Sequence, residues 1–312
     1  MVRRLLMLIL IQLIFISIVF PGVSYKDRMI DLIHELKKYT NQYDKPFYII
    51  SQNGHSLINI NQNIFKLLFN KNGSNGKYFN SIDGISFEFG DYSYFLNRDI
   101  QKKLQLAHKA DIKVFLIGYE KDCKKIEKIY DFARRKNYAA YISPSYNLDV
   151  IPNINFANSL SKENLTLQNV DSFIYMINPA KYKTKKEFLK ELKKSDYDLL
   201  IIDLFFNKEI INKKEVNSLK KKNNGKKRIV LSYLSVGEAE NYRYYWKRKW
   251  NYKKPSFVLK QNERWPNSYI VKFWDMRWVD ILKDYLDKIN ESNFDGVVFD
   301  VVDTHIHFDK EE

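Results

Sequence analysis

The sequence of 312 residues predicts an α/β fold in which parallel strands close into a (β/α)8 barrel. Nine short segments are apolar throughout, without alternating polar residues, which is typical of parallel strands buried on both faces. Helical patterns separate most of these segments, and such alternation favours a parallel sheet. Eight or nine strands in about 285 residues fit a (β/α)8 barrel. A doubly wound open sheet is the alternative, although the chain has no glycine-rich phosphate-binding turn.

The predicted elements follow one another in a regular order along the chain. Residues 27–43 carry apolar side chains at helical spacing and predict an amphipathic helix. Further helices are predicted over residues 185–194, 215–222 and 279–292. No proline-rich or glycine-rich linker divides the chain, so residues 25–312 are expected to form one domain. The strands are predicted at residues 47–51, 84–89, 113–118, 139–143, 173–177, 199–206, 228–234, 269–274 and 296–302.

The first 24 residues have the features of a secretory leader. Arg3 and Arg4 precede an apolar run over residues 5–20, and Ser24 is a small residue at a plausible cleavage site. An uncleaved membrane anchor is the alternative, since the run is slightly short for a membrane span. The mature protein is therefore expected to be secreted or to act on the outer face of the cell membrane.

The cysteine and histidine content excludes several kinds of site. The single cysteine, Cys123, excludes an internal disulfide, a cysteine-based metal site and a redox motif built on a cysteine pair. His305 and His307 alternate along a segment that is expected to be extended, so the two could share a metal. An unordered pair near the chain end is the preferred interpretation. No metal and no cofactor are therefore expected.

The net charge of +15 raises the possibility of a nucleic-acid partner. The lysines are spread over many segments, however, and each segment resembles the solvated face of a helix. No nucleic-acid-binding signature accompanies them. We therefore expect no nucleic-acid partner, and contact with a membrane only through the leader if it is not cleaved. The chain is expected to act as a monomer.

Acidic and amide side chains follow most of the predicted strands. In a parallel barrel the catalytic groups lie at the carboxyl ends of the strands. Acids that only cap the following helices would explain one or two of these positions. That explanation fits Asp203 and Asp300 poorly, because both are embedded in apolar sequence, where an unpaired charge is costly. The strand-end residues are Gln52, Asn53, Glu88, Asp203, Glu238, Glu240, Asp275, Asp300 and Asp303.

This combination of acids, amides and aromatic rings points to carbohydrate chemistry. Glycosidic cleavage needs two carboxyl groups, one protonated to assist the leaving oxygen and the other ionised. Rings near the strand ends could stack on sugars, and two or three are expected to do so. These rings are Tyr233, Trp246, Trp250, Trp265 and Trp274.

Four segments together resemble glycoside hydrolase family 114, the endo-α-1,4-polygalactosaminidases and their relatives. The longest is YLSVGEAENYRYYW at residues 233–246, and the others are YDLLIID at 197–203, VKFWD at 271–275 and FDGVVFDVVD at 294–303. The resemblance implies a TIM-barrel fold. It also implies hydrolysis of α-1,4-linked galactosamine polymers by acidic residues.

The resemblance also implies which residues react. Asp203 matches the strand-end aspartate of the family, and Glu240 best matches the glutamate after the Tyr-x-Ser-x-Gly turn, with Glu238 as the competitor. We expect Glu240 to be the general acid and Asp203 the nucleophile or base. Arg243 is expected to orient a glutamate. The other expected substrate-binding residues are Tyr233, Trp274, Asp275, Asp300, Asp303, Gln52, Asn53 and Glu88.

The order of the segments differs from that of the family. The strand followed by Gln52-Asn53-Gly54 and the strand that ends at Glu88 come before the Asp203 segment, whereas relatives have them after the strand that matches Asp300. We therefore expect a circularly permuted barrel whose break follows the Asp300 strand. Chain termini that lie close together make such a rearrangement tolerable.

Two functions remain open from the sequence. The first is a secreted glycoside hydrolase that acts on a polysaccharide, the expected partner. The second is a non-catalytic carbohydrate-binding barrel at the cell surface. Residues 265–268 read WPNS where characterised family members carry a further glutamate in a Trp-x-Gly-Glu segment, and this favours the second.

Overall fold

The structure is a computed structural model that describes residues 24–60, 73–152, 164–222 and 224–310. The predicted leader, except for Ser24, lies outside the described residues. Within the described ranges, no helix has the length and apolar character needed to cross a membrane.

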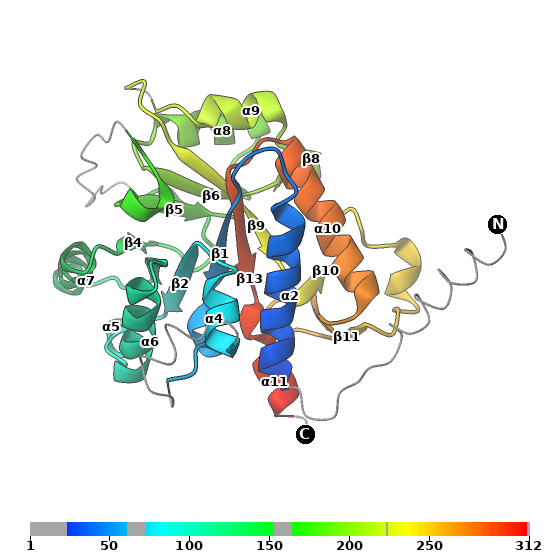
Figure 1. Ribbon diagram of the computed structural model, residues 1–312. Coiled ribbons are helices and arrows are strands. Elements are labelled where there is room, and N and C mark those ends of the chain that lie inside the picture. Colours follow the sequence, from blue (N-terminus) through cyan, green and yellow to red (C-terminus); the bar gives the residue numbers. More distant parts are fainter. Residues whose placement is uncertain (1–23, 61–72, 153–163, 223, 311–312) are drawn as a thin grey trace.

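Eight parallel strands form one sheet that curves into a barrel (Figure 1). Neighbouring strands pair in the order β4-β3-β2-β1-β13-β9-β6-β5, and a single bridge between Ala140 and Ser172 joins the two outer strands. The (β/α)8 TIM barrel predicted from the sequence is therefore confirmed. Its strands are β1 (Tyr48–Gln52), β2 (Gly84–Phe89), β3 (Lys113–Gly118), β4 (Ala139–Ile142), β5 (Phe173–Met176), β6 (Leu199–Asp203), β9 (Ile229–Ser235) and β13 (Gly296–Asp300).

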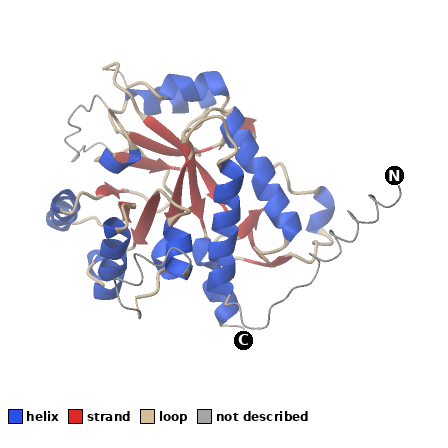
Figure 2. Cartoon of the chain, viewed as in Figure 1, coloured by secondary structure: helices blue, strands red, loops and turns tan. Residues whose placement is uncertain are grey.

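Helices surround the sheet (Figure 2). Several begin at a polar side chain that accepts a hydrogen bond from the first turn, as Thr184 does before α8 and Asn212 before α9. The described part of the β4–β5 connection contains only one short 3-10 turn, η2 (Leu167–Asn169). The helices are α2 (Tyr25–Thr40), α4 (Ser74–Phe79), α5 (Tyr92–Phe95), α6 (Arg98–Lys109), α7 (Cys123–Arg135), α8 (Lys185–Lys194), α9 (Lys213–Leu219), α10 (Met276–Glu291) and α11 (His305–Asp309).

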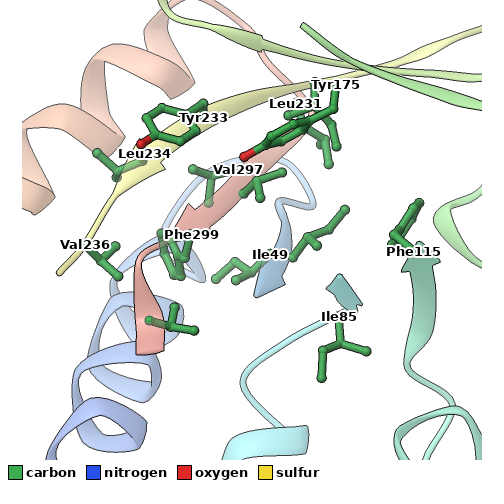
Figure 3. Packing of buried hydrophobic residues seen from close by; sticks show 14 of the residues in the cluster. Ile49, Ile85, Phe115, Tyr175, Leu231, Tyr233, Leu234, Val236, Val297 and Phe299 are labelled. Atoms are coloured by element: carbon green, nitrogen blue, oxygen red, sulfur yellow. The ribbon is translucent and has the colours of Figure 1, made fainter. Parts of the chain in front are cut away.

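Apolar side chains from many strands fill the interior of the barrel (Figure 3). Phe115 and Leu231 point into it, whereas Ile49, Ile85 and Val297 lie on the opposite face of their strands, toward the surrounding helices, and all five are fully buried. Because helices cover the outer face of the strands while this core covers the inner face, nearly every strand residue is buried. This burial on both faces explains why the strand segments are apolar throughout.

A second, smaller sheet follows β9 and corrects one prediction. β10 (Glu238–Glu240), β12 (Ser268–Val271) and β11 (Val258–Gln261) pair antiparallel in the order β10-β12-β11. The segment predicted as a ninth barrel strand therefore belongs to this sheet. The stretch after Ser235 contains a further strand, β10, because its backbone pairs with β12. The remaining short elements are β7 (Phe205–Phe206), β8 (Glu209–Ile210), η1 (Gly54–Leu57), η3 (Arg248–Asn251) and η4 (Val302–Thr304).

The helix α11 lies against the first turn of α2 (Figure 1). The rings of Tyr25 and Phe308 have centroids 5.2 Å apart. His305 and His307 lie in α11, so the extended segment predicted for them is wrong. His305 is buried, with its two ring nitrogens 3.2 Å from Asp309 and 3.2 Å from Ser56.

Candidate active site

Six acidic side chains gather where the barrel strands end. Because parallel strands end at the same face of a barrel, acids from different strands meet there. Glu88 acts electrostatically on both Asp300 and Asp303, and Glu240 and Asp303 both act on Glu238. Glu88 comes from β2, Asp203 from β6, Glu238 and Glu240 from β10, Asp300 from β13 and Asp303 from η4.

Asp300 has the most strongly shifted carboxyl group of this cluster. Burial, and then the negative charge of Glu88, raise its pKa to about 8 from an ordinary value of 3.8. Asp303 adds to the rise, while a 2.8 Å hydrogen bond from the backbone N–H of Val301 opposes it. Asp300 is therefore protonated at neutral pH while it lies beside other carboxylates.

Polar groups from the ends of the two neighbouring strands, β1 and β3, hold Glu88. The amide nitrogen of Gln52 donates to Glu88 Oε2 at 3.1 Å, and the hydroxyl of Tyr119 donates to Oε1. Asn53, whose φ of 51° lies in the left-handed region, accepts the backbone N–H of Glu88 at 3.0 Å. Gln52 and Asn53, predicted to bind substrate, thus position a carboxylate. Tyr119 was missed, although its place directly after β3 marks it as a strand-end residue.

Asp203 and Glu240 meet at one buried guanidinium. Arg243 donates to both oxygens of Asp203, at 2.8 and 2.7 Å, and to Glu240 Oε2 at 2.7 Å. Burial alone would lower the pKa of Arg243, but the two carboxylates raise it well above its ordinary value. The hydroxyl of Tyr242 binds the other oxygen of Glu240. The expected contact between Arg243 and a glutamate is present, and the same arginine also binds Asp203.

Glu238 and Asp303 form a second acidic pair in this region. Glu238 Oε1 accepts a 2.8 Å hydrogen bond from the amide of Asn262. Burial, followed by the charges of Glu240 and Asp303, raises the pKa of Glu238 despite that bond. Burial also raises the pKa of Asp303, and Glu88 adds to the rise. Neither residue has a salt bridge to a lysine or arginine within the described residues.

The backbone between Asp300 and Asp303 is strained. Val301 has φ 60° and ψ 32°, a left-handed conformation that is costly for a β-branched residue. Its carbonyl oxygen lies so close to Gly237 that a Cβ there would be 2.2 Å away. This turn directs both aspartates toward the cluster, and it requires glycine at position 237.

Two tyrosines rise from the strands beneath the acids. Tyr233 of β9 and Tyr175 of β5 are buried, and burial raises the pKa of each well above its ordinary value. The charges of Asp300 and Glu88 add to the rise for Tyr175. No protein partner of the Tyr175 hydroxyl is found among the described residues. Tyr175, labelled in Figure 3, was missed because the sequence of its segment indicates only a buried strand.

Trp274 and Asp275 do not join the acids. The ring of Trp274 packs on Tyr25 and Phe308, with centroids 5.1 and 4.8 Å apart. Asp275 caps the first turn of α10 and binds Arg277 at 2.7 Å. Both residues therefore fix the position of the helices around the barrel.

The tryptophans expected to stack on sugars are divided between core and surface. Trp246 packs on Trp250 and Tyr269, and Trp250 is buried. Trp265 is 59% exposed. In the part of the chain that the structure describes, no three histidine, cysteine or acidic side chains form a cluster able to hold a metal ion.

Comparison with known proteins gives several partial relatives. An uncharacterized protein of Methanocaldococcus jannaschii, MJ1477, is 34% identical over 127 residues, which cover 39% of this chain and 35% of the relative. An uncharacterized protein of Thermotoga maritima is 32% identical over 83 residues, 27% of this chain and 26% of the relative. One of Deinococcus radiodurans is 37% identical over 82 residues, 26% and 27% of the two chains. The chain thus spans about a third or less of these curated relatives.

A solved structure is also similar in part. The crystal structure of Aspergillus fumigatus Ega3 in complex with galactosamine has 28% sequence identity, covers 36% of this chain and 39% of that chain, and gives a TM-score of 0.29. The model of glycoside-hydrolase family GH114 matches residues 157–312, which is half of the chain and contains Asp203, Glu240 and Asp300. The chain belongs to glycoside-hydrolase family GH114.

Proposed function

We propose that this glycoside hydrolase cleaves an α-1,4-linked galactosamine-containing polymer at the mouth of the barrel, with Asp300 as the general acid and Glu88 as its carboxylate partner. One observation carries the proposal: the pKa of Asp300 is raised to about 8 beside Glu88. A glycosidase needs one carboxyl group that keeps its proton at the working pH and a second that is ionised. Neighbouring carboxyl groups whose environments separate their proton affinities are the usual way to assign these two roles.

The pair expected from the sequence, Asp203 and Glu240, has a different setting. Each carboxylate already binds Arg243, at 2.7 to 2.8 Å, and one also binds Tyr242. A carboxylate bound to a buried guanidinium would have to break that ion pair to carry the proton for the leaving oxygen. The assignment of Glu240 and Asp203 to catalysis stays a prediction. We propose that these two residues fix the shape and charge of the site.

The charge of the cluster supports a cationic substrate. Glu88, Glu238 and Asp303 lie close enough to affect one another or Asp300, and none has a salt bridge to a basic residue within the described part of the chain. A protonated amine on a sugar would lower the repulsion among these carboxylates. This favours galactosamine over neutral sugars despite the net charge of +15. The predicted leader would place the enzyme outside the cytoplasmic membrane.

The proposed function is tested by hydrolysis of de-N-acetylated galactosaminogalactan oligosaccharides. Wild type is expected to release shorter products, whereas Asp300→Asn and Glu88→Gln lose about 1,000-fold or more in kcat, because each removes one of the two carboxyl groups. Asp131→Asn is the matched control and should retain full activity, because Asp131 is exposed and, within the described ranges, pairs only with Arg134.

The alternative function is a non-catalytic carbohydrate-binding barrel. Its specific support is the sequence WPNS at residues 265–268, which lacks the glutamate expected there. Wild type that binds the oligosaccharides without any turnover, with equal binding by Asp300→Asn, would favour this alternative. Turnover that survives Asp300→Asn and Glu88→Gln but is lost in Glu240→Gln would return catalysis to the pair expected from the sequence.

We also propose that the barrel is circularly permuted relative to its family. The family model matches residues 157–312, which contain β5, β6, β9 and β13. β13 pairs with β1 at four registered positions and α11 packs on α2, whereas one bridge joins β4 to β5. The strand pairing is thus weakest between β4 and β5, which follow one another within the chain, and is complete between β13 and β1. This supports the proposal that the break in the barrel lies at a different place than in the family.

Reversing the order of the two halves tests the permutation. A chain in which residues 164–310 precede residues 24–152 through a short Gly-Ser linker is expected to fold with an unfolding midpoint close to that of wild type. A chain opened between β2 and β3 is the control and should be less stable, because six registered pairs join those strands. The proposal fails if the first chain does not fold and the second does.

A further inference from the structure

Tyr146 presents an exposed aromatic ring close to the carboxylates. The residue is 58% exposed, although it follows directly on the turn after β4. It stacks on the ring of Tyr119, with centroids 4.3 Å apart and planes inclined by 23°. Tyr119 is buried, and its hydroxyl binds Glu88. Tyr146 is therefore one ring away from the proposed catalytic pair.

The orientation of the Tyr146 ring is fixed before any ligand binds. One face is covered by Tyr119, and the hydroxyl donates to the carbonyl of Gly90 at 3.2 Å. The turn that carries the ring is held by Ser143, whose hydroxyl donates to the carbonyl of Ser145 at 2.7 Å. A ring fixed from two loops loses little rotamer freedom when a ligand covers its open face.

The chemistry of that open face suits a sugar ring that carries an amine. One face of a pyranose presents mainly C–H groups, and covering an aromatic ring with them removes apolar surface from water. A protonated amine near the same ring is attracted by its electron-rich face. Tyr119 covers the other face of Tyr146 and binds Glu88 through its hydroxyl, so the open face of Tyr146 lies beyond Tyr119, at the edge of the carboxylate site.

We infer that the open face of Tyr146 is a sugar-binding subsite at the edge of the site that takes a hexosamine ring of the polysaccharide further along the chain from the bond that is cleaved. The inference rests on the proposed function. Tyr146 thereby acts in binding, while Tyr119 beneath it positions Glu88.

Kinetics on oligosaccharides of increasing length test the subsite. Tyr146→Ala is expected to raise KM about tenfold for chains long enough to reach it and to leave kcat within about twofold, because the lost contact forms before the reaction. Tyr146→Phe keeps the ring and should behave like wild type. Tyr252→Ala removes another exposed tyrosine, 85% exposed, and serves as the control with unchanged kinetics.

Two further results distinguish sugar binding by Tyr146 from a purely structural role of its ring. If Tyr146 served only to hold Tyr119 against Glu88, Tyr146→Ala would lower kcat and move the pH profile with KM unchanged, and the inference would be overturned. If wild type hydrolyses no oligosaccharide, the proposed function fails. The subsite is then judged by calorimetric binding of the same oligosaccharides to Asp300→Asn with and without Tyr146→Ala, where equal affinity of the two proteins would overturn it.

Discussion

The guanidinium of Arg243 binds the carboxylate of Asp203 through two parallel hydrogen bonds of 2.8 and 2.7 Å. A third N–H of the same arginine binds Glu240, and all three side chains are buried. One cation thus lies between two anions that come from different sheets. This arrangement joins β10 of the small sheet to β6 of the barrel.

Removing the guanidinium should therefore strongly destabilise the protein. Arg243→Met is expected to lower the free energy of unfolding by about 3–5 kcal/mol, because two buried carboxylates lose their only cation among the described residues. Arg243→Lys should cost less, since it keeps the charge and loses the paired geometry.

Urea unfolding measures both changes. Arg277→Met is the matched control, because Arg277 also binds a carboxylate through two nitrogens but is exposed. Its loss should cost about 1 kcal/mol or less. Equal losses for Arg243→Met and Arg277→Met would contradict the buried ion-pair description.

The alkaline limb of the activity profile should report the proton of Asp300. If Asp300 is the general acid, kcat/KM is expected to fall above pH 8, because its pKa is raised to about 8 and the deprotonated form cannot protonate the leaving oxygen. Asp303→Asn removes a negative neighbour that helps to raise that pKa, so it should shift the limb to lower pH. Glu120→Gln is the control, and a limb that moves equally in both variants would reject the assignment.

The same proton should make stability depend on pH. The pKa of Asp300 is about 8 in the folded protein and near 3.8 in the unfolded chain. Between these values the folded state keeps a proton that the unfolded state releases. The contribution of this proton to the free energy of unfolding is therefore full below pH 4 and is lost as the pH rises toward 8. Each tenfold difference in proton affinity corresponds to about 1.4 kcal/mol.

Asp300→Asn lacks this loss and should gain stability over wild type as the pH rises. The measurement is urea unfolding of both proteins at pH 4, 6 and 8. A difference between the two that stays constant over this range would show that the Asp300 carboxyl has no raised pKa in the folded state.

The turn at Val301 should respond oppositely to two substitutions. Gly237→Ala places a Cβ about 2 Å from the Val301 carbonyl oxygen and is expected to cost about 1–3 kcal/mol. Val301→Asn should stabilise by about 1 kcal/mol, because asparagine tolerates the left-handed conformation better than a β-branched residue does. Thermal unfolding of the two variants distinguishes this from a general sensitivity to substitution, with Gly90→Ala as the control, because a Cβ at Gly90 would meet nothing closer than 3.8 Å.

Removing a tyrosine hydroxyl should cost more unfolding free energy where the hydroxyl is hydrogen-bonded than where the described residues offer it no partner. Tyr119→Phe removes a hydrogen bond to Glu88 and is expected to lower the unfolding free energy by about 1.5–3 kcal/mol. Tyr175→Phe removes a hydroxyl for which the described residues offer no partner, and its effect should stay within about 0.5 kcal/mol. Chemical denaturation of both variants at pH 7 is the measurement, and a larger loss for Tyr175→Phe would reverse the two descriptions.

Local patterns determined most of the barrel in advance. Eight apolar segments became its strands because burial on both faces leaves a signature that needs no knowledge of neighbours. The segment near residue 270 has the same apolar character, but it pairs with β10 and lies outside the barrel. Local sequence does not encode which strand a segment will pair with, and that is why this prediction was wrong.

By itself, the sequence determined that acids would gather at one face, since parallel strands bring their carboxyl ends together. Only the tertiary structure decided how those acids differ. It placed Arg243 between Asp203 and Glu240, and Asp300 beside Glu88. It also brought Gln52 and Tyr119 within hydrogen-bond distance of Glu88. The proton affinity of a carboxyl group depends on burial and on charges a few ångströms away, and these are distances through space between segments that lie far apart in the chain.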